Sequence, residues 1–153
     1  MNKLNNISAL DAHIGYWLRL VSNEVSHAFK LKLEQHDISV AEWVILREVL
    51  QLGTAMPSQL AQNMRMTRGA ISKLIERLFN KALIVRMTDD EDRRYQHITL
   101  TPSGEKLIPL LASIADKNDA HFFDFLDEKQ RTMLIALMKN IAQHHQIKHI
   151  PTE

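Results

Sequence analysis

One pair of short β-type segments interrupts a chain whose other periodic segments all indicate helices. Residues 83–87 and 96–100 are rich in β-branched residues and roughly alternating, and the polar run 88–94 separates them. Such a pattern predicts an antiparallel hairpin with a long, charged tip. A two-stranded hairpin is marginal by itself and needs helices to pack against. The predicted fold class is therefore mainly α with a small β-hairpin.

The helices are predicted from apolar periodicity and from residues that cap helix starts. A long apolar stripe extends to about residue 34, and the helix after residue 40 closes near Gly53. The last ten residues, 144–153, are expected to fray. The predicted helices begin at Ser8, at the capping box of Ser39 and Glu42, at Pro57, at Thr67, at Thr101–Pro102 and at the capping residues 127–130.

This order divides the chain into three parts, residues 1–36, 37–101 and 102–153. The middle part has the elements of a small domain. The two outer parts are long apolar helices that can bury their faces only against each other or against a second chain. A homodimer built from the outer helices is therefore expected.

Composition limits the possible function classes. The chain contains no cysteine, which excludes disulfides, cysteine-ligated zinc and a thiol switch. No apolar run reaches the length of a membrane span, and the first residues lack the pattern of a signal peptide, so a cytoplasmic location and no membrane contact are expected. Between residues 58 and 81 there are five basic residues and one acidic residue, which gives +4 within a chain of net charge +1. A local basic patch of this kind is typical of contact with a phosphate backbone.

The segment 68–80 has two chemically different faces when it is drawn as a helix. One face is apolar and carries Ile71, Leu74, Ile75 and Leu78. The opposite face is small and polar, with cations, and centres on Gly69, Lys73, Glu76 and Asn80, flanked by Ser72 and Arg77. This face suits close entry into a DNA major groove. For this helix alone, an ordinary solvated face explains the pattern equally well.

The hairpin favours the DNA interpretation. A hairpin beside a helix-turn-helix forms a winged helix, in which an arginine at the tip reaches the minor groove or the backbone. Arg93 and Arg94 lie at the predicted tip, and Asp92 is expected to orient Arg94 through a charge-assisted hydrogen bond. A solvated loop would be the interpretation if the hairpin stood alone, because four acids and three bases lie between residues 86 and 94.

The segment 58–86 followed by 92–101 resembles the core of the MarR family of transcriptional regulators. Its wing signature is matched by Asp92, Arg94, Leu100 and Thr101. The resemblance implies an obligate dimer formed by the N- and C-terminal helices, a palindromic operator in double-stranded DNA, and a repressor released by a small molecule or oxidant. Ala82 stands where the family often has glycine. Because alanine tolerates a left-handed cap less well than glycine, Asn80 is expected to end the helix.

The combined hypothesis is a winged helix-turn-helix (37–101) between an N-terminal dimerisation helix (1–36) and C-terminal dimerisation helices (102–153). The residues expected to contact DNA are Arg65, Thr67, Arg68, Gly69, Ser72, Lys73, Glu76, Arg77, Arg93 and Arg94, with Asp92 orienting the wing.

An aromatic effector is expected to bind between the dimer helices and the DNA-binding part. Its candidate pocket residues are His13, Tyr16, Trp17 and Trp43, which are equally suited to packing.

Two other functions remain as alternatives, a metal-responsive regulator of the same fold and a helical protein-interaction module that does not bind DNA. The eight histidines are scattered, so no metal site and no cofactor are assigned. No nucleophile, paired-carboxylate or phosphate-loop motif supports an enzyme.

Overall fold

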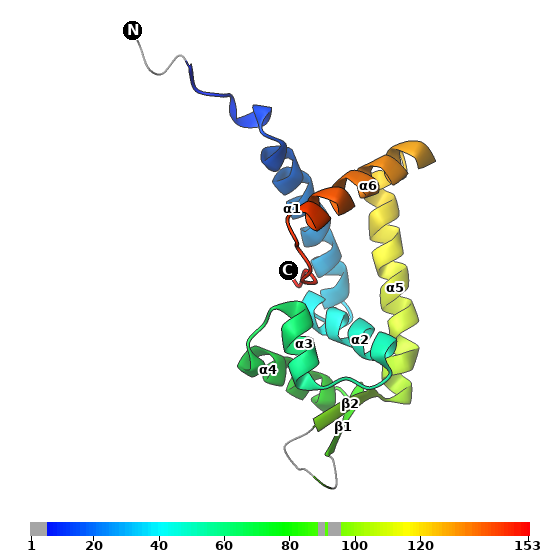
Figure 1. The fold of residues 1–153 in the computed structure, drawn as a ribbon. Coiled ribbons are helices and arrows are strands. Elements are labelled where there is room, and N and C mark those ends of the chain that lie inside the picture. Colours follow the sequence, from blue (N-terminus) through cyan, green and yellow to red (C-terminus); the bar gives the residue numbers. More distant parts are fainter. Residues whose placement is uncertain (1–5, 89–90, 92–95) are drawn as a thin grey trace.

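The computed structural model describes residues 6–88, 91 and 96–153. It is mainly helical with one antiparallel hairpin, as the sequence predicts. The elements in chain order are η2 (Leu10–Ala12), α1 (Ile14–Glu34), α2 (Val40–Leu52), α3 (Pro57–Met64), α4 (Arg68–Asn80), β1 (Ile84–Thr88), β2 (Gln96–Leu100), α5 (Pro102–Phe123) and α6 (Glu128–His144). The long helices α1 and α5 lie side by side, and α2, α3, α4 and the hairpin gather at one end of them (Figure 1).

Capping residues start α2, α4, α5 and α6 where the sequence predicts them. The long N-terminal helix is an exception, because α1 begins at Ile14 and not at Ser8; the short turn η2 and the extended residue His13 precede it. In the capping box of α2, Ser39 Oγ accepts from Glu42 N at 3.1 Å, and Ser39 N donates to Glu42 Oε2 at 2.8 Å. Thr67 and Thr101 cap α4 and α5 through their hydroxyl oxygens, and Asp127 caps α6. Each cap satisfies an amide that the first helical turn leaves without a partner.

The hairpin is tied to the helical part through a third extended segment. β1 and β2 are antiparallel, with Ile84 opposite Leu100 and Arg86 opposite Ile98. Ile98 also exchanges two backbone hydrogen bonds, of 3.0 and 2.8 Å, with Ala55 in the link between α2 and α3. This pairing, which the sequence does not predict, fixes the root of the hairpin against the helices.

The core lies within this end of the molecule. Its fully buried members come from α1, α2, α3, α4, the hairpin and the first half of α5, and include Leu33, Ile45, Leu46, Val49, Leu60, Ile71, Leu78, Ile98 and Leu111. The sequence analysis counts residues 102–153 as dimer-forming. The structure corrects this for Leu111, which is fully buried within its own chain and is therefore not available to an interface.

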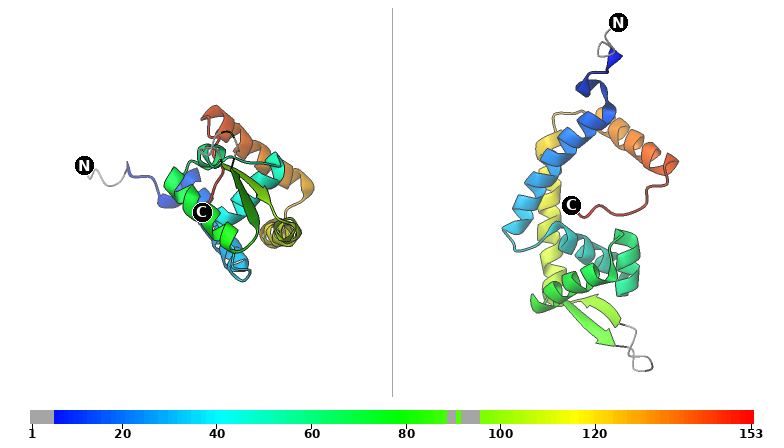
Figure 2. Two further views of the ribbon diagram at one scale, coloured as in Figure 1. Left: turned by 90° about the horizontal axis from the view of Figure 1, so that it is seen from below. Right: turned by 90° about the vertical axis from the view of Figure 1, so that its left-hand side faces the viewer.

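The other end of the molecule exposes many large apolar side chains. On α1 these are Ile14, Trp17, Leu18, Leu20 and Val21, and on α6 they are Met133, Leu134, Ile135, Leu137, Met138 and Ile141. Ile14 is 76% exposed and Phe125, between α5 and α6, is 83% exposed. The right-hand view of Figure 2 shows α6 extending away from α1 and α5. Within the described ranges, no helix is both long and apolar enough to cross a membrane.

The segment after α6 returns to the end of the molecule that holds α2, α3 and α4, which contradicts the expectation of a frayed tail. Gln146 takes a left-handed conformation with φ 55°, and Ile147 N then bonds to Ala142 O at 2.8 Å, which reverses the chain. Ile150 N donates to Asn63 O of α3 at 3.1 Å, and the Ile150 side chain packs against the core. The tail therefore links α6 to the helix-turn-helix.

Candidate nucleic-acid interface

Helices α3 and α4 form a helix-turn-helix. Arg65 ends α3 in the left-handed conformation (φ 48°), and Met66 N bonds back to Ala61 O at 3.1 Å. Thr67 then begins α4, because its Oγ1 accepts from Ala70 N at 3.1 Å. The turn is therefore only a few residues long, and the cap residue that the sequence predicts is confirmed.

The two faces predicted for α4 are both present. Ile71, Leu74, Ile75 and Leu78 are buried in the core. The opposite face is open to solvent. All eight of the expected DNA-contact residues that the structure describes are exposed, namely Arg65, Thr67, Arg68, Gly69, Ser72, Lys73, Glu76 and Arg77. The space around Gly69 is open, since a Cβ placed there would meet no protein atom within 4 Å.

Lys81, one of the five basic residues of the patch, is neutralised inside the protein. Its Nζ lies 3.0 Å from Oε1 and 3.1 Å from Oε2 of Glu42, a carboxylate that is only 2% exposed. It also donates to the backbone carbonyl of Asp37. The amide of Ser39 and the ammonium of Lys81 together satisfy the buried carboxylate, as a buried charge requires. Lys81 therefore anchors the end of α4 to the start of α2.

Glu76 is also paired within the protein. Arg86 Nη1 on β1 lies 2.7 Å from Glu76 Oε2, and the Arg86 guanidinium lies 4.0 Å from the centroid of the Phe79 ring. Arg86 is not among the residues predicted from the sequence to have a function. Its contact with Glu76, ten residues earlier in the chain, depends on how the hairpin packs against α4, and no local sequence pattern signals that packing.

A compact corner joins α4 to β1. Helix α4 ends at Asn80, as predicted, but Ala82 nevertheless adopts the left-handed conformation with φ 57°. Leu83 N bonds to Leu78 O at 3.0 Å, and Ala82 N bonds to Phe79 O at 2.9 Å. This is the Schellman pattern, in which glycine usually takes the place that Ala82 occupies here.

The start of α5 is clamped onto this corner. Thr101 donates from Oγ1 to Ala82 O at 2.6 Å and from its amide to Leu83 O at 3.1 Å. Gly104 is buried beneath it, and a Cβ placed there would lie 2.1 Å from Leu83 O. The absence of a side chain at Gly104 is thus what allows α5 to approach the backbone between α4 and the hairpin.

The residues expected at the wing tip, Asp92, Arg93 and Arg94, lie outside the described residues. Among the described residues, the last pair of the hairpin is Thr88 with Gln96.

The four candidate effector residues fall into two groups. His13 immediately precedes α1 and makes no side-chain capping hydrogen bond there. Tyr16 and Trp17 pack edge to face with ring centroids 5.2 Å apart. Trp17 Nε1 donates to Asp11 O at 2.8 Å. Trp43 lies on α2 beside a hollow of about 310 Å³. The residues of the first group do not line this hollow.

The hollow beside Trp43 lies between α2, α5 and the tail. Arg47 stacks its guanidinium over the Trp43 ring at 5.3 Å, and the other lining residues are Val44, Glu48, Ala112, Ala115, Asp116 and Ile150. It combines an aromatic wall with one cation, Arg47, and two carboxylates, Glu48 and Asp116.

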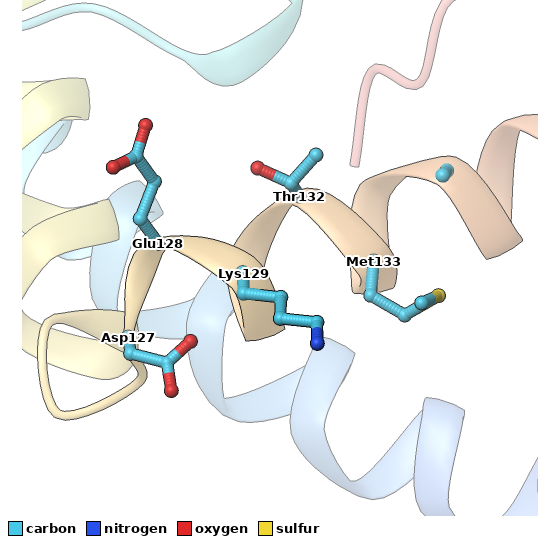
Figure 3. A pocket seen from close by; sticks show the side chains of 6 residues that line it. Asp127, Glu128, Lys129, Thr132 and Met133 are labelled. Atoms are coloured by element: carbon cyan, nitrogen blue, oxygen red, sulfur yellow. The ribbon is translucent and has the colours of Figure 1, made fainter.

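A second hollow, of about 630 Å³, lies on α6 alone (Figure 3). Its lining residues are Asp127, Glu128, Lys129, Thr132, Met133 and Ala136. Because every lining residue comes from one helix, this hollow is an open face rather than an enclosed pocket. Elsewhere in the described part of the chain, no group of three or more histidine, aspartate or glutamate side chains is placed to hold a metal ion.

The comparisons with known proteins agree with this geometry. Residues 38–95 match the MarR family. An uncharacterized HTH-type transcriptional regulator of Bacillus cereus is 29% identical over 143 residues, which cover 90% of this chain and 93% of that protein. The HTH-type transcriptional regulator SarZ of Staphylococcus haemolyticus is 25% identical over 138 residues, which cover 90% of this chain and 92% of that protein.

Two solved structures share the fold. BpsR of Bordetella bronchiseptica, whose DNA binding is regulated by 6-hydroxynicotinic acid, has a TM-score of 0.77 at 20% identity and covers 90% of this chain and 98% of that chain. A mutant of MarR from E. coli, complexed with operator DNA, has a TM-score of 0.74 at 20% identity and covers 88% of this chain and 99% of that chain. The predicted winged helix-turn-helix with helical ends is therefore confirmed as the fold.

Proposed function

We propose that this chain is a transcriptional regulator of the MarR family that binds duplex DNA through α4 and the hairpin. The observation that carries the proposal is the exposed cationic face of α4, held in a helix-turn-helix by a fully buried apolar face. Helix α4 enters the major groove, where Arg68 and Lys73 reach base edges or phosphates. The hairpin beside it contacts the adjacent minor groove or backbone.

The DNA-binding form is a homodimer, and the operator is palindromic. A monomer would leave many large apolar side chains of α1 and α6 exposed to water, which favours their burial against a second chain. Met133, one of these side chains, also lines the open hollow on α6 (Figure 3). A symmetric dimer presents two α4 helices, so the half-sites repeat about 34 Å apart. Light scattering at micromolar concentration tests this, and a monomeric mass would contradict it.

A binding titration against duplex DNA tests the main proposal. Fluorescence anisotropy with a random-sequence duplex at low salt should show binding that weakens steeply as salt is raised, because each cation that contacts phosphate releases counterions. Selection from a random duplex library should then yield a palindromic site. Failure of the wild-type protein to bind any duplex at low salt would leave the helical protein-interaction module as the alternative.

Arg94 is proposed to contact DNA from the wing tip, with Asp92 as its orienting partner. Arg94→Ala should reduce operator affinity by about 1–3 kcal/mol without changing the dimer. Asp92→Ala should reduce operator affinity by part of this amount, although it removes a negative charge near DNA. Tighter binding by Asp92→Ala would contradict the orienting role.

The regulator is proposed to act as a repressor that an aromatic acid releases from DNA. The hollow beside Trp43 supports this, because Arg47 lies over the ring and can pair with a carboxylate. The compound that regulates BpsR, 6-hydroxynicotinic acid, is a suitable first probe. It should lower operator affinity of the wild type and have a smaller effect on Arg47→Met. An equal effect on both proteins would place the effector elsewhere.

A further inference from the structure

Outside the buried core, one polar contact between α4 and the hairpin joins one side chain of β1 to two of α4. Arg86 reaches from β1 to Glu76, where the two charged atoms are 2.7 Å apart, and to the face of Phe79, whose centroid is 4.0 Å from the guanidinium carbon. Glu76 and Phe79 are three residues apart in a helix, so their side chains are neighbours on its surface. One planar guanidinium can therefore pair with the carboxylate and stack on the ring at once.

This contact contributes more to orientation than to overall stability. The Arg86 and Glu76 side chains are 30% and 53% exposed, and an ion pair with that exposure adds little to the free energy of unfolding. Arg86 stands opposite Ile98, the buried strand residue that also pairs with Ala55. The root of the hairpin is thus held by its backbone, and the Arg86 side chain sets the angle between the hairpin and α4.

The pairing also changes what Glu76 does on the face that meets DNA. An unpaired carboxylate at this position would repel phosphates, and its removal would strengthen binding. The Glu76 and Arg86 pair has no net charge, and the paired carboxylate contacts a second element.

We propose that Arg86 and Glu76, with Phe79, form a lock that fixes the wing relative to α4, so that both elements reach the same DNA site together. They are positioning residues, not base-reading residues. This inference rests on the proposed DNA binding, and it assigns Glu76 a role inside the protein in place of the DNA contact expected from the sequence.

The test measures operator affinity and groove protection for Glu76→Gln, Arg86→Met, Arg86→Lys and the Glu76→Gln/Arg86→Met double variant. Glu76→Gln should weaken binding by about three- to tenfold, the scale of coupling between contacting groups, although it removes a negative charge. The double variant should bind no more weakly than Arg86→Met, because either single change already breaks the lock and the double variant also lacks the carboxylate that Arg86→Met leaves unpaired. Arg86→Lys keeps the charge but not the planar group, so it should restore little of the affinity.

Groove protection separates positioning from simple loss of charge. Methylation protection at guanine N7 reports the major groove, and hydroxyl-radical protection at the edges of the site reports the wing. In the variants that break the lock, hydroxyl-radical protection at the edges of the site should fall, while methylation protection at guanine N7 should stay as in the wild type. Thermal midpoints within a few degrees of the wild type should show that each variant is folded, as the exposure of the pair implies.

The outcomes divide clearly. The lock would be overturned, with DNA binding intact, if Glu76→Gln bound the operator as tightly as the wild type or more tightly. It would also be overturned if the losses of affinity in the two single variants simply added in the double variant. A wild-type protein that binds no duplex would instead overturn the proposed function.

Discussion

Replacing Gly104 by alanine should destabilise the protein through one short contact. A Cβ at this position would lie 2.1 Å from Leu83 O, 3.1 Å from Leu83 C and 3.4 Å from Leu100 Cδ2. The first atom is a backbone oxygen that also accepts a hydrogen bond from Thr101 N at 3.1 Å. It cannot turn away as the end of a flexible side chain would. Relief therefore requires that α5 and the corner between α4 and β1 move apart.

The expected loss of unfolding free energy is about 1–3 kcal/mol. Overpacking a tight site costs about 1–3 kcal/mol, and the hydrogen bond to Leu83 O adds about 1 kcal/mol if it breaks. Alanine recovers up to about 1 kcal/mol through its better helix propensity. For a chain of this size, the net loss corresponds to a fall in the thermal midpoint of roughly 2–12 °C.

Differential scanning calorimetry at one fixed protein concentration measures this fall. Gly69→Ala is the matched control, since it makes the same change near the start of a helix with no protein atom within 4 Å, and its midpoint should not fall. A Gly104→Ala midpoint equal to that of the wild type would refute the reasoning. It would mean that the corner between α4 and β1 moves without loss of unfolding free energy and does not hold α5 rigidly against α4.

Four further outcomes are expected. Gly69→Ala should weaken duplex binding by more than about tenfold in an anisotropy titration, because the open space at Gly69 is available for close approach of DNA; unchanged affinity would mean that this turn of α4 stays clear of the groove. Lys73→Ala should lower affinity and flatten the salt slope by about one ion, with no change in the thermal midpoint. Ala82→Gly should raise the free energy of unfolding by about 0.5 kcal/mol in urea titrations, because relief of the left-handed conformation exceeds the added entropy of the unfolded chain. The amide of Ile150 should exchange slowly with deuterium because it donates to Asn63 O, and exchange at the rate of a free peptide would show that the tail is detached.

Local signals in the sequence predict the elements well. The capping box of Ser39 and Glu42 and the caps at Thr67 and Thr101 set three helix starts, and each acts within four residues of its own position. The strands differ by at most one residue from the expected segments, since 84–88 replaces 83–87 and 96–100 is unchanged. Apolar spacing likewise identifies the buried face of α4, because a helix with one apolar face must bury it.

Contacts between distant segments are what the sequence leaves undetermined. Arg86 and Glu76 meet only because the hairpin folds back on α4, and Ile150 meets Asn63 only because α6 returns the chain. The capping residue Glu42 has the pattern of an exposed helix start, and nothing nearby signals that Lys81 will cover it. The four residues expected to line one effector pocket show the same limit. The structure does not bring them together, because Tyr16 and Trp17 contact each other at the start of α1, while Trp43 lines a hollow beside α5 and the tail.

The buried pair of Glu42 and Lys81 constrains how this sequence can change during evolution. Loss of Lys81 alone leaves a carboxylate that is 2% exposed without its cation, and breaking a buried pair in this way costs about 3–5 kcal/mol. Replacing both residues by apolar side chains of similar volume costs far less. The two positions are therefore expected to covary among related chains, and a single change at either one should be tolerated only after the other has changed.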